Sequence, residues 1–244
     1  MSRVAFRRVV AAITVLTVAF ALFWLTSPVG AGPGTPLRMY SADGTDLHVA
    51  ALTYTEGPDP RWKRLGEASS RIIPSRLLLE AGTFEMGSGQ DLALDAGVDA
   101  AATVLRKSVL EEPVGVYPGV VTGTSSGLAW AVATILLSDP SLREGGVIYA
   151  TGSLHSSDSV GSINGLAEKL RTAGLKDARV VFVPAAQFDE AVSALNIRGD
   201  FETAELVVGV ASVSEALAYL CESTPDATSC SPGRSGRPLS KLGR

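Results

Sequence analysis

The segment that most constrains the fold of this chain runs from Ser125 to Leu137. It is apolar almost all round, which is typical of a helix that is buried on every side. Other strands and helices must cover such a helix, and the rest of the sequence offers both. We therefore expect a single α+β domain with this helix in its core.

Hydrophobic periodicity and turn signals place the remaining elements. Strands are predicted at 37–54 (two, around a turn at 42–44), 77–81, 114–121 (broken at 118–119), 147–151, 180–183 and 205–210. Helices are predicted at 90–110, 166–173, 187–195 and 213–220, and a loop at 55–70. The helix at 90–110 is expected to bury one stripe, formed by Leu92, Ala96, Ala100, Thr103 and Val104.

The N-terminus has the pattern of a membrane segment. Arg3, Arg7 and Arg8 precede an apolar run, Val9–Leu25, and a Pro/Gly-rich stretch follows it. The run is near the ~18 residues that span a bilayer, and the positive charge predicts that the N-terminus stays inside. A small-residue site at 29–31 leaves two outcomes open, an uncleaved anchor or a secreted protein after signal cleavage. Both place the remainder outside the cytoplasmic membrane.

These patterns predict three regions: a membrane segment and linker at 1–34, a folded domain at 35–221, and a disordered Ser/Pro/Gly/Arg-rich tail at 222–244. Cys221 and Cys230 lie close together, so in an exported protein a disulfide is expected, with two unpaired thiols as the alternative. No histidine lies near them, so we expect no metal site there, and no cofactor.

Composition argues against nucleic acid as a partner. The net charge is −4, no basic stripe is visible, and aromatic residues make up only 6% of the chain. A basic surface and aromatic stacking platforms are the usual signs of nucleic-acid binding.

Lys169 is the most unusual residue. On the predicted helix, Leu166, Lys169, Leu170 and Ala173 share one apolar face. Burial disfavours the charged form of a lysine and lowers its pKa. A neutral amine can take a proton from a serine hydroxyl, so Lys169 is a candidate general base.

Ser125 is the candidate nucleophile. It lies between Gly123 and Gly127, where a strand leads into the buried helix. The N–H groups at a helix N-terminus can stabilise an oxyanion, worth about 3–4 kcal/mol per donor. The alternative is an N-cap serine in a Gly-rich turn. The G-x-S-x-G pattern also suggests a Ser-His-acid site, but only His155 follows the serine, and no suitable acid accompanies it.

Several segments, in order, resemble the proteolytic domain of Lon proteases (family S16). Gly123-Thr-Ser-Ser-Gly127-Leu-Ala is similar to its G-P-S-A-G segment, Thr151-Gly-Ser-Leu154 to T-G-E-I/L, and 160–170 to V-x-P-I-G-G-x-x-x-K-L. The stretches at 171–174 and 180–185 continue the likeness. Ser125 and Lys169 fall on the catalytic serine and lysine of that family, and Thr151 on a threonine near the lysine amine.

The resemblance implies a ribosomal protein S5 domain 2-like fold and a Ser-Lys dyad peptidase. The most similar subgroup is the membrane-anchored, ATPase-free Lon-like proteins of bacteria. The chain has no Walker A segment, and we expect no AAA+ or PDZ module in it. Its expected substrates are therefore flexible exported proteins or peptides, cleaved without ATP. Hexameric rings are usual for full-length Lon, but they depend on the ATPase, so a homo-oligomer is left open.

The chain departs from the family pattern at several positions. Thr124 replaces a proline, Ser126 an alanine, Ser153 a glutamate and Asn164 a glycine, and the loop 155–159 is about one residue longer. Ser126 is the rival nucleophile. A catalytically inactive, membrane-anchored binding module is the alternative function.

Overall fold

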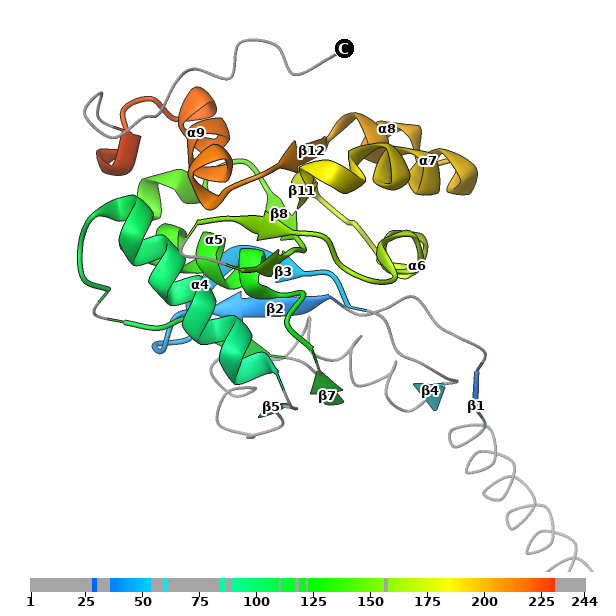
Figure 1. The fold of residues 1–244 in the computed structure, drawn as a ribbon, viewed down its shortest axis with the longest axis horizontal. Coiled ribbons are helices and arrows are strands. Elements are labelled where there is room, and N and C mark those ends of the chain that lie inside the picture. Colours follow the sequence, from blue (N-terminus) through cyan, green and yellow to red (C-terminus); the bar gives the residue numbers. More distant parts are fainter. Residues whose placement is uncertain are drawn as a thin grey trace, which may run out of the picture. The chain divides into compact units, whose positions relative to one another are not determined.

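The structure is a computed structural model (Figure 1). It describes residues 28–29, 36–53, 59–60, 84–86, 89–109, 111–116, 119–121, 123–155 and 158–230. The predicted membrane segment, the predicted strand at 77–81 and most of the predicted loop at 55–70 lie outside these residues. Within the described part of the chain, no helix has the length and hydropathy needed to span a bilayer.

The chain divides into two units. The first combines residues 1–32 and 55–73, and its described part is an antiparallel pair of two-residue strands, β1 (Pro28–Val29) and β4 (Asp59–Pro60). The second combines residues 33–54 and 74–244 and contains all the other elements described below.

A six-stranded mixed sheet forms the centre of the second unit. Its order is β12-β11-β8-β3-β2-β6. The strands are β2 (Leu37–Tyr40), β3 (Asp46–Ala51), β6 (Val114–Val116), β8 (Val147–Ala150), β11 (Ala178–Pro184) and β12 (Val207–Val210). The four strands β3, β8, β11 and β12 run parallel, whereas β2 pairs antiparallel with both β3 and β6.

Two short strand pairs lie outside the central sheet. β5 (Phe84–Met86) pairs parallel with β7 (Gly119–Val121), and β9 (Ser153–Leu154) pairs antiparallel with β10 (Val160–Gly161). The region predicted as one strand broken at 118–119 contains two strands that belong to different sheets, β6 and β7, and β7 already begins at Gly119.

Helices cover both faces of the sheet (Figure 1). They are α4 (Gln90–Leu105), α5 (Gly127–Ser138), α6 (Leu166–Thr172), α7 (Phe188–Arg198), α8 (Phe201–Glu205) and α9 (Val213–Ser223), with 3-10 turns at Pro140–Arg143, Ala185–Gln187 and Thr228–Cys230. α4, α5 and α9 share one hydrophobic core with the sheet, and α6 and α7 share a second.

Strand β8 shows how the two cores are separated. All four of its residues are buried. Ile148 and Ala150 belong to the core under α5, whereas Val147 and Tyr149 belong to the core under α6. Successive side chains of a strand point to opposite faces, so a continuous apolar strand requires cover on both sides. The expected α+β class with a buried central helix is thereby confirmed.

The predicted buried stripe of α4 is wrong. Leu92 is 66% exposed, and of the predicted stripe only Ala100 is buried. The buried face instead follows Ala93, Gly97 and Ala100, which also have helical spacing. A Cβ atom on Gly97 would lie 2.5 Å from the Cβ of Trp130 in α5. Small residues thus let α4 approach α5 closely, and the large Leu92 is turned outward.

The C-terminal region is ordered further than predicted. α9 runs to Ser223, and a disulfide joins Cys221 to Cys230, as the sequence suggested. Within the loop that the disulfide closes, the N–H of Ser229 donates to Asp139 Oδ2 at 2.6 Å. This contact ties the end of the described chain to the C-terminal end of α5, so the predicted tail boundary at 222 comes too early.

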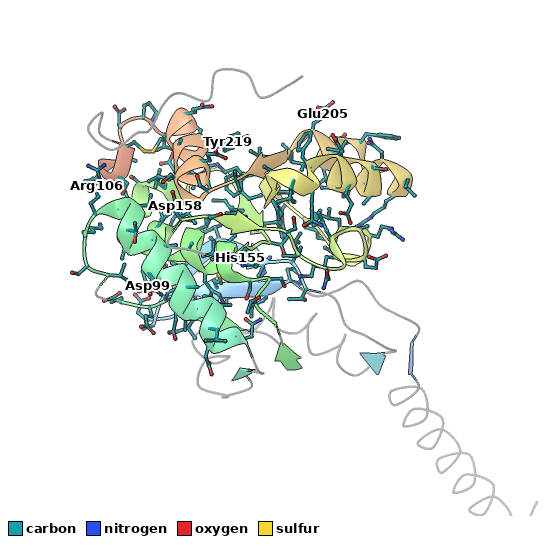
Figure 2. The ribbon with its side chains drawn as sticks, in the orientation of Figure 1. Asp99, Arg106, His155, Asp158, Glu205 and Tyr219 are labelled. Carbon is teal, nitrogen blue, oxygen red and sulfur yellow. A yellow bond between two sulfur atoms is a disulfide. The ribbon has the colours of Figure 1, made fainter. Side chains whose placement is uncertain are left out.

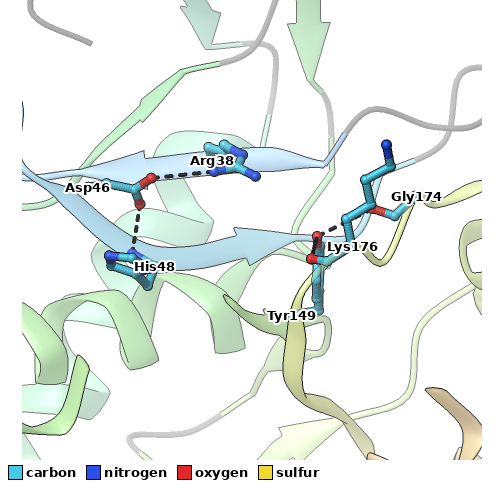
Figure 3. A network of polar contacts seen from close by, with 6 residues as sticks. All are labelled: Arg38, Asp46, His48, Tyr149, Gly174 and Lys176. Carbon is cyan, nitrogen blue, oxygen red and sulfur yellow. Dashed lines mark hydrogen bonds and ion pairs between the residues drawn. The ribbon is translucent and has the colours of Figure 1, made fainter. Parts of the chain in front are cut away.

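The β2–β3 hairpin contains His48, one of the two histidines of the chain. Asp46 accepts a hydrogen bond from the guanidinium of Arg38 at 3.3 Å and one from the backbone N–H of His48 at 2.7 Å (Figure 3). His48 has a positive φ of 56° at the irregularity in the hairpin register. The hydrogen bond between the backbone of His48 and Asp46 therefore stabilises the hairpin.

Candidate active site

Ser125 lies in the turn that leads into α5. Gly123 begins this turn with a φ of +89°, a conformation that favours glycine. Ser125 is partly exposed, and its carbonyl oxygen accepts hydrogen bonds from the N–H of Gly152 at 2.8 Å and from the hydroxyl of Thr151 at 3.1 Å. The backbone of the serine is thus fixed against the end of strand β8.

Lys169 lies on α6 as the sequence predicted. Leu166, Leu170 and Ala173 are fully buried, and Lys169 is only 5% exposed. The helix packs on the opposite side of the sheet from most of α5, in the core that contains Tyr149 and Leu52. The long lysine side chain is therefore needed to bring its amine to the turn that carries Ser125.

The two side chains meet. Lys169 Nζ lies 2.6 Å from Ser125 Oγ, although 44 positions separate the residues in sequence. Burial lowers the pKa of Lys169 from 10.5 to about 8. An amine with a pKa of about 8 is neutral in roughly a tenth of the molecules at pH 7, against ~0.03% for an unshifted lysine. The arrangement therefore supplies a base in contact with a hydroxyl.

Ser126 is placed differently from its neighbour. It is 3% exposed, and its hydroxyl donates to Gln90 Oε1 at 2.8 Å. Ser126 occupies the N-cap position of α5, but its side chain makes no capping hydrogen bond. The capping interpretation of the Gly-rich turn therefore finds no support at either serine, and the rival nucleophile is buried with its hydroxyl bonded to Gln90.

The glycine after the two serines allows close packing. A Cβ atom on Gly127 would lie 3.2 Å from Leu154 Cγ on β9. The N–H groups of Gly127 and Leu128 are already bonded to the carbonyl oxygens of Thr124 and Gly152. We take the N–H groups of Ser125 and Ser126, which precede these two in the chain, as the candidates for binding an oxyanion beside the dyad.

α6 is held by its neighbours at both ends. The side-chain amide of Gln187 accepts from the N–H of Ile163 at 2.8 Å and donates to its carbonyl oxygen at 3.0 Å, just before the helix. At the other end, Arg198 donates to the carbonyl oxygen of Ala173 at 2.6 Å, and also to those of Leu170 and Arg171. These bonds satisfy carbonyl groups that a helix C-terminus leaves open.

The loop after α6 is anchored as well. The hydroxyl of Tyr149, on β8, lies 3.0 Å from the carbonyl oxygen of Lys176 and 3.3 Å from that of Gly174 (Figure 3). Tyr149 is 1% exposed, and these two hydrogen bonds are partly buried. α6 therefore has little freedom to slide, and the position of Lys169 is set by the fold around it.

The chain is attached to α9 at Asp158, which follows β9. Asp158, labelled in Figure 2, accepts hydrogen bonds from the N–H and the hydroxyl of Ser214, both at 2.9 Å. His155 Nε2 lies 3.1 Å from Ser153 Oγ, and Ser153 also contacts the carbonyl oxygen of Ser162. Ser153, which stands where the Lon pattern has a glutamate, thus stabilises the loop.

The described residues offer no group of three His, Cys, Asp or Glu side chains arranged to hold a metal ion. A cavity of about 130 Å³ lies beside the disulfide, between α4 and α9. Its lining includes Arg106, Asp158 and Ser214 but neither Ser125 nor Lys169. We assign this cavity no part in the chemistry of the dyad.

Comparison with known proteins adds no relative: no family model matches the chain, and a search of curated proteins finds no match.

The sequence predicts no role for Gln90, Gln187 and Arg198, which bond to the segments that carry Ser125 and Lys169. Gln90 could have been recognised, because it begins the helical series Gln90, Ala93, Gly97 and Ala100, a polar residue on a face of small ones. Gln187 and Arg198 carried no such signal, since their acceptors are backbone groups remote in sequence.

Proposed function

We propose that this protein is an ATP-independent serine endopeptidase with a Ser-Lys dyad, similar to the Lon proteolytic domain in fold and chemistry. The observation that carries the proposal is the contact of 2.6 Å between Ser125 Oγ and the amine of Lys169, which is 5% exposed. A buried lysine is costly for a fold, so its contact with a partly exposed serine calls for a functional reason. The ordered Lon-like segments give independent support.

The proposed reaction begins with the neutral amine. Lys169 Nζ takes the proton of Ser125 Oγ as this oxygen attacks the carbonyl carbon of a peptide bond. The N–H groups of Ser125 and Ser126 stabilise the negative charge on the substrate oxygen. The ammonium of Lys169 then protonates the leaving nitrogen, the C–N bond breaks, and an ester on Ser125 remains.

Water completes the cycle. Lys169 takes a proton from the water as its oxygen attacks the ester carbon, and the C–O bond to Ser125 breaks. The proton then passes from Lys169 to Ser125 Oγ, which restores both groups. We propose that Thr151 orients the amine of Lys169, and its hydroxyl also holds the carbonyl oxygen of Ser125 at 3.1 Å.

The substrates that fit this proposal are flexible segments of exported proteins or peptides, because no ATP-driven unfolding is involved. The proposed location is the outer side of the cytoplasmic membrane, with the N-terminal segment as anchor or, alternatively, as a cleaved signal. This part of the proposal depends on the arginines and the apolar run at the N-terminus.

The test is cleavage of an unstructured protein by the full-length chain without ATP. We expect fragments with the wild type and none with Ser125→Ala or Lys169→Met. Thr124→Ala is the matched control, since it removes a neighbouring exposed hydroxyl outside the dyad, and it should retain cleavage. Cleavage at the wild-type rate by both Ser125→Ala and Ser126→Ala would refute the peptidase. Loss of cleavage in Ser126→Ala with full activity in Ser125→Ala would make Ser126 the nucleophile.

A further inference from the structure

Gln90 is buried, polar and placed at the turn that carries Ser125. It is the first residue of α4 and is 1% exposed. Its Nε2 donates to the carbonyl oxygen of Gly123 at 2.7 Å, and its Oε1 accepts from the hydroxyl of Ser126 at 2.8 Å. The two contacts bracket Ser125 on both sides along the chain.

The direction of these bonds is fixed. The carbonyl oxygen of Gly123 can only accept, so the NH₂ group of Gln90 must face it. The oxygen of the amide then faces Ser126, whose hydroxyl must donate its proton there. Ser126 is thereby held on the α4 side of the turn, while Ser125 is left to face Lys169.

The start of α4 also lies against the turn through its backbone. Gly89, the residue before Gln90, has a φ of +91°, and a Cβ atom on it would lie 3.3 Å from Gly123 Cα. This close approach brings the short amide side chain of Gln90 within reach of both partners. A buried amide with both ends bonded resists movement, because an unbonded end would lose its partner without gaining water.

We propose that Gln90 is a positioning residue that holds the Gly123–Ser126 turn so that the hydroxyl of Ser125 meets the amine of Lys169. Gln90 acts through the backbone of Gly123 and the side chain of Ser126 and does not touch the reacting atoms. The catalytic importance of this role depends on the proposed peptidase function, whereas the geometric role does not. A displacement of about 1 Å at a reacting group can cost ~100-fold in rate.

The test measures phosphonylation of Ser125 by a small fluorophosphonate probe, in which Oγ bonds to phosphorus and fluoride leaves, in the full-length protein, with the site mapped by mass spectrometry. Rates are expressed per folded molecule, with the folded fraction taken from circular dichroism. We expect Gln90→Met to label ~10- to 100-fold more slowly than wild type. Ser126→Ala leaves the hydrogen bond from Gln90 to Gly123 in place, so its labelling rate should fall by a smaller factor. Leu105→Val, at the far end of the same helix, lowers stability by ~1 kcal/mol and should label at the wild-type rate.

Two results would overturn the inference. One is a wild-type labelling rate in folded Gln90→Met, which would make Gln90 a stabilising residue only. The other is a crystal structure of Gln90→Met in which the distance from Ser125 Oγ to Lys169 Nζ is unchanged. A crystal structure of Gln90→Met in which Ser125 Oγ and Lys169 Nζ lie beyond hydrogen-bond reach would support the inference. If the wild type itself is not labelled, the proposed peptidase fails, and the crystal structure alone decides the role of Gln90.

Discussion

The burial of Lys169 has a consequence for stability that can be measured without a substrate. In the folded protein, burial lowers the pKa of Lys169 to about 8, against 10.5 for a lysine in water. Each pKa unit corresponds to about 1.4 kcal/mol, so holding the ammonium in the fold costs about 3 kcal/mol at pH 7. Lys169→Met removes the charge while keeping a long, apolar side chain.

The sign of the pH effect follows from proton binding. Between pH 8 and 10.5 the unfolded chain binds the proton of Lys169 and the folded protein has released it, so wild-type stability rises with pH in this window. Below pH 8 Lys169 is protonated in both the folded and the unfolded protein, so the full cost of burying its ammonium remains. The free energy of unfolding of Lys169→Met should therefore exceed that of the wild type by about 3 kcal/mol at pH 7 and by about 2 kcal/mol at pH 9. Loss of the bond to Ser125 subtracts roughly 1 kcal/mol at both values.

The assay is guanidinium unfolding of the full-length protein at pH 7 and pH 9, followed by circular dichroism. The decisive quantity is the change in the stability difference between variant and wild type, because constant terms cancel in it. Lys176→Met removes the same charge from an exposed position on the loop after α6 and should give a difference that is equal at both pH values. A stability difference between Lys169→Met and the wild type that stays constant or grows with pH would refute the conclusion that burial lowers the pKa of Lys169.

Three further outcomes follow from the packing. Gly97→Ala should lower the free energy of unfolding by ~1–3 kcal/mol in chemical denaturation, since its Cβ would lie 2.5 Å from that of Trp130; a more stable variant would contradict the close approach of α4 to α5. Arg198→Met should lower the free energy of unfolding by ~1–3 kcal/mol and slow the labelling of Ser125, because the last carbonyl groups of α6 lose their donor. Labelling at the wild-type rate would show that the bonds of Arg198 do not affect the position of Lys169. Replacing Cys221 and Cys230 by serine should cost ~2–3 kcal/mol in thermal unfolding, and an unchanged Tm would show that the closed loop adds nothing.

The sequence predicted those parts of the fold whose periodicity was unambiguous. The fully apolar segment of α5 could only be a buried helix, and the apolar face of α6 placed Lys169 inside before any geometry was known. The face of α4 was mistaken, because large side chains were given more weight than small ones. Its inner face is set by close contact at Gly97, which hydropathy does not measure.

The candidate site was predictable only in part. Ser125 and Lys169 stand in motifs that can be read along the chain, and the structure brings their side chains together. The residues that hold them act across long separations: Gln90 is 33 positions from Gly123, and Arg198 is 25 from Ala173. Such contacts depend on how α4 and α7 pack, which local pattern does not encode.

The proposed mechanism requires that a neutral Lys169 activates Ser125. The measurement is the pH dependence of covalent labelling of the wild-type protein with a fluorophosphonate, with each adduct mapped to its residue. We expect one adduct, on Ser125, whose rate of formation rises about tenfold from pH 7 to pH 9 with a midpoint near pH 8, and which is lost in Lys169→Met. An adduct on Ser126, or labelling of Ser125 at the same rate in Lys169→Met, would contradict it.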